Sequence, residues 1–147
     1  MATGAKNSLG TVFSIESELA GIYIAIEEII DLPGILGDKT GKIDVTSIDS
    51  VGYKEYIADA LKDAPEVSFK CNFVESALGQ TRVKLLAGTG ATTSFKLVLS
   101  NKVATSGTTI TRAGYITSRA ITAGKGSQLI LEFSVQFSGA PVETVAV

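Results

Sequence analysis

The sequence predicts an α+β fold, mainly β, in which two antiparallel sheets pack as a sandwich or half-barrel beside one main helix and a second, shorter helix. Apolar and polar residues alternate cleanly over 66–74 and 128–137, so each segment is predicted to be a strand with one buried and one polar face. The helical segments fall between strands without alternating with each one, which favours this class over a doubly wound parallel sheet.

The length of the chain, 147 residues, suits a single domain. Residues 1–10 are small and polar, so we expect a flexible N-terminal arm there. Residues 11–142 are expected to form the domain, and residues 143–147 a C-terminal tail.

The remaining strand candidates are runs rich in β-branched or alternating apolar residues, bounded by Gly, Pro or polar residues. They cover residues 11–16, 21–31, 43–48, 94–100 and 108–122. The last of these runs contains Gly114, which predicts a kink or bulge in a long strand.

Two segments carry a helical pattern. Residues 52–62 place five apolar side chains on one stripe, and Pro65 ends the segment. That stripe consists of Tyr53, Tyr56, Ile57, Ala60 and Leu61. Residues 76–87 predict the shorter helix, in which Gly79 lowers the helix propensity.

Charge and hydropathy limit the classes of partner. The 13 basic and 15 acidic residues are interspersed and give a formal charge of -2, whereas proteins that grip DNA cluster Lys and Arg against the phosphates. Hydrophobic residues make up 45% of the chain and the mean hydropathy is +0.31, so surplus apolar surface is available for subunit interfaces.

The side-chain inventory argues against an enzyme. There is no histidine, which removes imidazole acid–base chemistry and histidine metal sites. The only cysteine, Cys71, lies on the apolar face of its predicted strand and is expected to be an inert core thiol. We therefore expect no catalytic residues, no metal and no cofactor. No apolar run reaches the ~18 residues of a membrane helix, so no membrane insertion is expected.

Residues 32–42 hold one proline and three glycines, which predict a loop. The loop also carries Leu32, Ile35 and Leu36. These apolar residues either form a docking surface or tuck back onto the domain, and the sequence leaves both readings open.

The order of segments supports a resemblance to the tail tube proteins of long-tailed bacteriophages. The sequence IDVTSIDS at 43–50 resembles the "IDVT-x-LDS" segment of that family. The next segment, 52–67, is similar to the family's short helix, with Pro65 where relatives often have glycine, and SFKCNF at 68–73 is similar to its "xxNF" strand. The resemblance covers roughly residues 10–142 and also includes GYI at 114–116 and SGAP at 138–141.

The resemblance implies a non-enzymatic subunit that forms hexameric rings, in which four strands per subunit build a continuous inner β-barrel. The rings would stack into a hollow tube through which the genome passes during ejection, with DNA in transit and not specifically bound. Implied partners are other copies of the chain, tail-tip and tail-terminator proteins, and a tape measure protein in the lumen. The implied location is the virion tail, after assembly in the host cytoplasm.

Two residue sets follow as expectations. Candidate inter-ring contacts are the N-terminal arm and, in the 32–42 loop, Leu32, Pro33, Ile35, Leu36, Asp38, Lys39 and Lys42. Candidate lumen-facing polar residues, from the polar faces of two predicted strands, are Ser68, Lys70, Asn72, Gln128, Glu132, Ser134 and Gln136.

Two other functions compete with the phage tail tube. One is the tube protein of a type VI secretion system or phage-like bacteriocin, which carries an effector or no cargo. The other is a monomeric β-sandwich binding module, which usually displays exposed aromatic residues beside polar groups. The absence of tryptophan disfavours the second.

Overall fold

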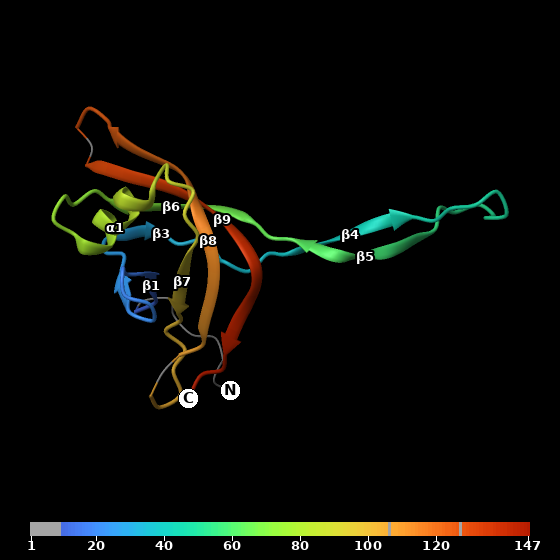
Figure 1. Cartoon of the computed structure of the whole chain (residues 1–147), viewed down its shortest axis with the longest axis horizontal. Coiled ribbons are helices and arrows are strands. Elements are labelled where there is room, and N and C mark those ends of the chain that lie inside the picture. The colour runs from blue at the N-terminus through green and yellow to red at the C-terminus, as the bar shows by residue number, and fades with distance from the viewer. Residues whose placement is uncertain (1–9, 106, 127) are drawn as a thin grey trace.

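The computed structural model of the chain describes residues 10–105, 107–126 and 128–147. The arm expected at 1–10 lies outside these residues, apart from Gly10. The described chain is mainly β and contains two antiparallel sheets and one helix, which confirms the predicted fold class. A seven-stranded sheet forms the body, and a two-stranded sheet extends from it (Figure 1).

The seven-stranded sheet has the order β2-β1-β7-β8-β9-β6-β3, with every neighbouring pair antiparallel. Its strands are β1 (Val12–Glu16), β2 (Tyr23–Ala25), β3 (Ile29–Asp31), β6 (Glu66–Asn72), β7 (Thr93–Val98), β8 (Thr109–Ala123) and β9 (Leu129–Thr144). The run predicted at 21–31 is thus divided between β2 and β3, which lie at opposite edges of the sheet.

The sheet curls around its own core without closing into a barrel. Phe13 on β1 stacks on Phe69 on β6, with ring centroids 4.6 Å apart, although three strands separate β1 from β6 in the sheet. Phe95 and Phe133 extend the row at either end, at 5.7 and 5.3 Å. All four rings are buried, so one face of the curled sheet forms the core.

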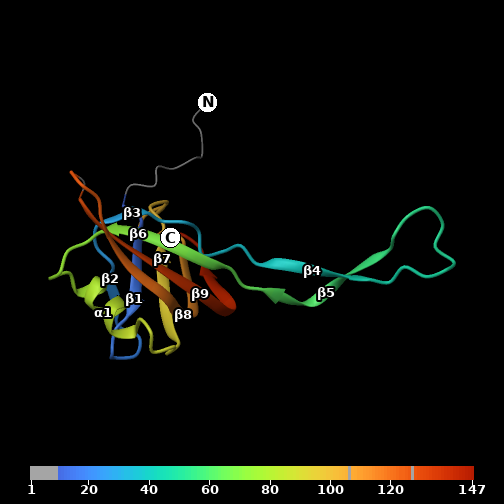
Figure 2. The same ribbon diagram turned by 90° about the horizontal axis from the view of Figure 1, so that it is seen from above.

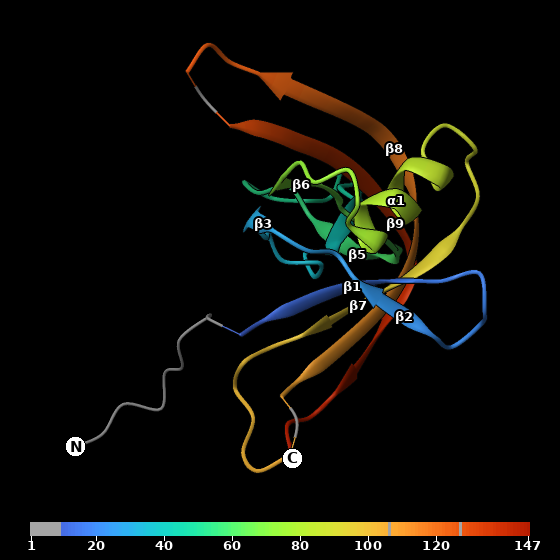
Figure 3. The same cartoon turned by 90° about the vertical axis from the view of Figure 1, so that its left-hand side faces the viewer.

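The long strands β8 and β9 bend around this core (Figure 3). The register of their pairing shifts between Thr111 and Ala113 and again between Ile116 and Ser118. Gly114 lies between the two shifts, and a Cβ there would sit 2.7 Å from the carbonyl oxygen of Gln136. The expected irregularity near Gly114 is therefore present. Because Gly114 has no side chain, the backbone of β9 can approach it closely.

The helix α1 (Leu78–Leu86) corresponds to the shorter predicted helix and packs against β1, β2 and β8. Its buried Gln80 donates hydrogen bonds to the carbonyl oxygens of Glu27 (3.2 Å) and Asn72 (2.8 Å), and accepts one from the N–H of Val74 (2.9 Å). One amide thus joins the helix to the crossing between β2 and β3 and to the end of β6.

The second sheet pairs β4 (Lys39–Asp44) with β5 (Tyr56–Asp63) and corrects the main predicted helix. Residues 52–62 have helical apolar spacing, but the segment lies away from the body, where no core is available to bury a helical stripe (Figure 2). An isolated helix of that length is marginal in water, whereas pairing with β4 satisfies the backbone of both segments. Ile57 accordingly pairs with Ile43, and Tyr56 with Asp44.

Gly79, which lowers the helix propensity of α1, allows the helix to pack closely on β2. The first testable prediction concerns this residue. A Cβ on Gly79 would meet the carbonyl oxygen of Ala25 at 2.3 Å and the Cα of Ile26 at 2.7 Å. Gly79→Ala is therefore expected to lower the free energy of unfolding by about 1–3 kcal/mol through overpacking. Helix propensity alone would raise it by about 1 kcal/mol.

Urea unfolding of the monomer measures this difference. The exposed Lys84→Ala, on the same helix, is the control and should shift stability by less than about 0.5 kcal/mol. A stabilised Gly79→Ala protein would contradict the close packing of α1 on β2.

Candidate functional site

The most conspicuous surface is the β4–β5 hairpin with its connecting loop, here called the arm (residues 39–63). It extends along the long axis of the molecule, away from the body (Figures 1 and 2). Large apolar side chains are exposed along it: Ile43, Val45, Ile48, Val51, Tyr53, Tyr56, Ile57 and Leu61. Exposed apolar surface on this scale marks an interaction site, because a soluble monomer gains nothing from displaying it.

The end of the arm, residues 45–55, is here called the tip, and it is an ordered loop. The N–H of Thr46 donates to the carboxylate of Asp44 (2.9 Å), and the Thr46 hydroxyl accepts from the N–H of Glu55 (2.8 Å). Hydrogen bonds from the hydroxyl and N–H of Thr46 lower the pKa of Asp44. The N–H of Ser50 also bonds the carbonyl of Ser47 at 3.1 Å, which closes a turn. The tip can therefore present its apolar side chains in a defined arrangement.

The root of the arm is held by a buried arginine on β8. The guanidinium of Arg112 is ion-paired to Asp38 at 2.6 Å and donates to the carbonyl oxygens of Ile35 (3.1 Å) and Gly139 (2.9 and 3.1 Å). The Arg112 side chain is 1% exposed, so these partners replace water for a fully desolvated cation. Since Asp38 directly precedes β4, this cluster fixes where the arm begins.

The chain returning from the arm is held by β9. The side chain of Gln136 donates to the carbonyl oxygen of Ala64 at 3.1 Å, and the N–H of Phe137 donates to that of Pro65 at 3.1 Å. Both ends of the arm are thus attached to the middle of the seven-stranded sheet.

The structure separates the candidates of the 32–42 loop. Ile35 is 0% exposed and belongs to the hydrophobic core, so for this residue the reading in which the loop tucks back holds. Leu36 is exposed, while Leu32 and Pro33 are half-buried. Asp38 is engaged with Arg112, and Lys39 and Lys42 lie on β4, where Lys42 sits over the ring of Tyr56.

The candidate polar residues come together on one face, opposite the phenylalanine core. Ser68 and Ser134 are cross-strand partners whose hydroxyl oxygens are 2.8 Å apart, and Lys70 is paired with Glu132. Gln128 donates to the side chain of Asn72 at 3.0 Å. Gln136 belongs to the same alternation along β9. The surface is rich in hydroxyl and amide groups and has balanced charge.

The long strands also offer free edges. In the described chain, β7 pairs with β8 only as far as Gly114, whereas β8 continues to Ala123. On the other side, β6 pairs with β9 from Ile130 to Gln136, whereas β9 continues to Thr144. Unpaired strand edges are templates for pairing with another chain.

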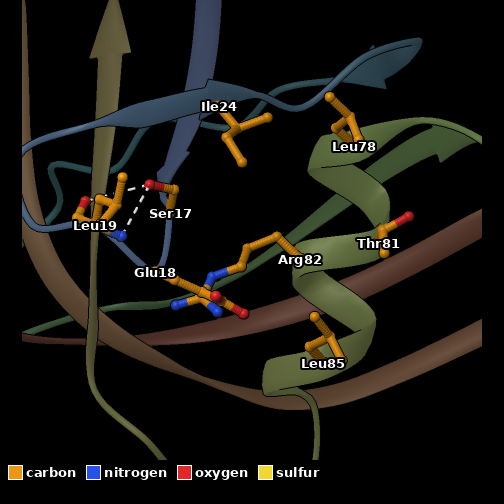
Figure 4. Close-up of a pocket in the computed structure, with 8 residues that line it drawn as sticks. All are labelled: Ser17, Glu18, Leu19, Ile24, Leu78, Thr81, Arg82 and Leu85. Carbon is orange, nitrogen blue, oxygen red and sulfur yellow. Dashed lines mark hydrogen bonds between the residues drawn. The ribbon is translucent and has the colours of Figure 1, made fainter.

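A further surface, here called the groove, lies between α1 and the connection from β1 to β2 (Figure 4). It has a volume of about 340 Å³ and is lined by Ser17, Glu18, Leu19, Ile24, Leu78, Thr81, Arg82 and Leu85. Arg82 extends from the helix across the groove, and its Nε donates to the carbonyl oxygen of Glu16 at 3.1 Å. Sequence reasoning missed both the groove and Arg112, because each depends on segments far apart in the chain.

The described residues offer little chemistry beyond these surfaces. No group of three or more His, Cys, Asp or Glu side chains among them is placed to hold a metal ion. Burial raises the pKa of the Cys71 thiol to about 11, so the thiol stays protonated near neutral pH. Among the described helices, none is long and apolar enough to span a membrane.

Comparison with solved structures identifies the fold. The tail of an empty gene transfer agent particle, refined with C6 symmetry, matches with a TM-score of 0.75 and 17% identity, over 96% of this chain and 100% of that one. A six-fold symmetrised baseplate of the anti-feeding prophage matches with a TM-score of 0.73 and 12% identity, over 99% and 98% of the two chains. The SPP1 tail tube matches with a TM-score of 0.62 and 14% identity, over 93% and 77%.

No protein-family model and no curated protein matches the sequence. The shared feature is therefore the fold, which is that of tail tube proteins as the sequence resemblance implied. The proteins that share it here are components of tails and a baseplate.

The second prediction concerns the arm root. Arg112→Met keeps an apolar side chain of similar length but leaves Asp38 and the carbonyl oxygens of Ile35 and Gly139 without their donor. Removing one partner of a buried ion pair is expected to lower the free energy of unfolding by about 3 kcal/mol or more. Urea unfolding checks this, with the exposed Lys84→Met as control. Equal stability of the two variants would show that Arg112 does not hold the root.

Proposed function

We propose that this chain, which has the tail tube fold, is the repeating subunit of a phage tail tube. Six copies form a ring, the rings stack, and the hollow tube conducts the genome during ejection. Support for ring formation comes from the C6 symmetry of the matched gene transfer agent tail and the six-fold symmetry of the matched baseplate. The proposal includes no catalysis and no cofactor.

The observation that carries the proposal is the free edge on each long strand. Residues 115–123 of β8 extend past β7, and the end of β9 extends past β6 on the opposite side. Rotation about a ring axis keeps strand directions, so β8 of one copy can pair antiparallel with β9 of the next. Repeating that contact closes a barrel and removes the exposed edges.

The polar face of β6 and β9 suits the lining of the channel. Ser68, Ser134 and Gln136 offer neutral groups, and the charges of Lys70 and Glu132 balance. A polymer with one negative charge per phosphate meets no cluster of cations there that would hold it. The same lining would accommodate a tape measure protein before the genome enters.

The arm supplies the contact between rings in this proposal. It leaves the body at the 32–42 loop, where Leu36 remains exposed, and it carries apolar side chains that only another chain can cover. Tail-tip and tail-terminator proteins would meet the same surfaces at the two ends of the tube. The finished tube belongs to the virion tail and is assembled in the host cytoplasm.

A tube of a phage-like bacteriocin or secretion system is the second candidate. The match to the anti-feeding prophage baseplate, with a TM-score of 0.73, is the observation that favours it, because this fold is then not confined to tail tubes. Gene neighbourhood separates the two candidates. Capsid and portal genes beside this one would indicate a phage, and their absence an injection particle.

The third prediction is the assembly itself. Negative-stain electron microscopy of the purified chain over a range of concentrations, with and without the tail-tip initiator complex, is expected to show six-fold rings or hollow tubes. Association buries apolar surface and pairs the free strand edges of neighbouring subunits, and a higher protein concentration shifts the equilibrium toward the assembled form. Monomers that persist at high concentration with the initiator present would refute the proposal.

The fourth prediction tests the 32–42 loop. Because Ile35 is buried, substituting it would test folding, so the informative change is Leu36→Asp, with Leu36→Ala as the matched control. A charge at an apolar ring-to-ring contact is expected to leave rings intact and prevent long tubes. Tube length on micrographs measures this. Full-length tubes from Leu36→Asp would exclude this loop from ring stacking.

A further inference from the structure

Among the residues that the structure describes, none covers the apolar tip of the arm. Ile48, Val51 and Tyr53 are 100%, 89% and 85% exposed. The loop between β4 and β5, to which they belong, lies at the far end of the long axis from the body (Figures 1 and 2), so the body as described does not cover it. The tip is therefore open to contact with a second molecule.

The groove lies on the other side of the body from the arm, beside α1 (Figure 1). Its apolar lining is also uncovered, since Leu19, Leu78 and Leu85 are exposed along it. Its volume of about 340 Å³ is small and its leucines face outward, which suits a few side chains of a protein loop.

Charge provides a second point of complementarity. The groove contains one cation, Arg82, whose head is positioned by its bond to the Glu16 carbonyl oxygen, and one anion, Glu18. The tip carries two anions, Asp49 and Glu55, around the cation Lys54. In a docked arrangement, Asp49 or Glu55 of the tip would lie beside Arg82, and Lys54 would lie near Glu18. Opposite charges would then face each other around the apolar contact.

The opposite placement of tip and groove suits a repeating structure. A contact between two different patches on identical copies is heterologous, so each copy contributes one tip and one groove and the contact repeats along an assembly. A monomeric protein would gain nothing from either patch.

We infer that the groove between α1 and residues 17–24 receives the arm tip of a second copy of this chain, with Ile48 and Val51 against the groove leucines and an acidic tip residue beside Arg82. This inference rests on the proposed tube function and names the surface that its arm contacts.

Disulfide trapping tests the contact directly. Ile48→Cys protein is mixed with Leu78→Cys or Leu85→Cys protein, assembled and oxidised, because a disulfide forms only when the two Cα atoms lie within about 7 Å. The native Cys71 is buried and gives little background. Val103→Cys, exposed in a loop of the body outside the groove, is the control partner. A covalent dimer with either groove position and none with Val103→Cys is the expected result.

A charge exchange gives an independent test. Arg82→Glu is expected to raise the protein concentration needed for tube formation about tenfold. Adding Asp49→Lys or Glu55→Lys should restore assembly in the Arg82→Glu background. Lys84→Glu makes the same charge change on the same helix outside the groove and should have little effect. Circular dichroism checks that the variants are folded.

The outcomes separate this inference from the function on which it rests. If tubes form but neither groove cysteine cross-links to Ile48→Cys, the inference is overturned and the tube function stands. The same holds if Ile48→Cys cross-links to Val103→Cys instead. A folded Arg82→Glu variant that assembles like Lys84→Glu also overturns it. Wild-type protein that forms no tubes with the initiator present refutes the proposed function, and the inference with it.

Discussion

The stacking of Phe13 on Phe69 across the curled sheet is the constraint on which the other features depend. It brings β1 against β6, so a single continuous sheet provides both layers around the core. Once that face is committed to the interior, the opposite face is free to be polar, and β8 and β9 bend around the core. These two strands also extend past their neighbours, and the proposed ring formation makes use of the free edges that result.

Local patterns predicted the strands whose environment is set by this core. The alternation in β6 and β9 identified both the buried phenylalanines and the polar candidates opposite them, because a strand has two faces that a two-residue period reveals. The same reasoning failed at residues 52–62. Their spacing fits a helix, but the segment lies outside the core, so its apolar residues are not selected by burial in one side of a helix and remain exposed on a strand. The predicted helix at this segment was therefore wrong.

The candidate surfaces also include some that local sequence patterns predict and others that they do not. The lumen candidates follow from alternation within single strands, and the structure places them on one face. Ile35 shows the limit of reading a loop by composition, because its burial depends on contacts with residues far along the chain. Arg112 and Arg119 both stand in the predicted strand at 108–122, so the sequence alone did not show which of them is buried and ion-paired. The groove gave no comparable signal, since it exists only where α1 meets the connection between β1 and β2.

The double attachment of the arm has a mechanical consequence. A pull on the tip reaches the body through two chain segments at once, one held by Arg112 and the other by the hydrogen bonds of Gln136 and Phe137. Both attachments lie on β8 and β9, so part of the load is delivered to the two longest strands at the centre of the sheet before it reaches the edge strand β3 along the chain. In the proposed tube, a pull on the arm would therefore be shared with β8 and β9, the strands proposed to pair with the neighbouring subunits.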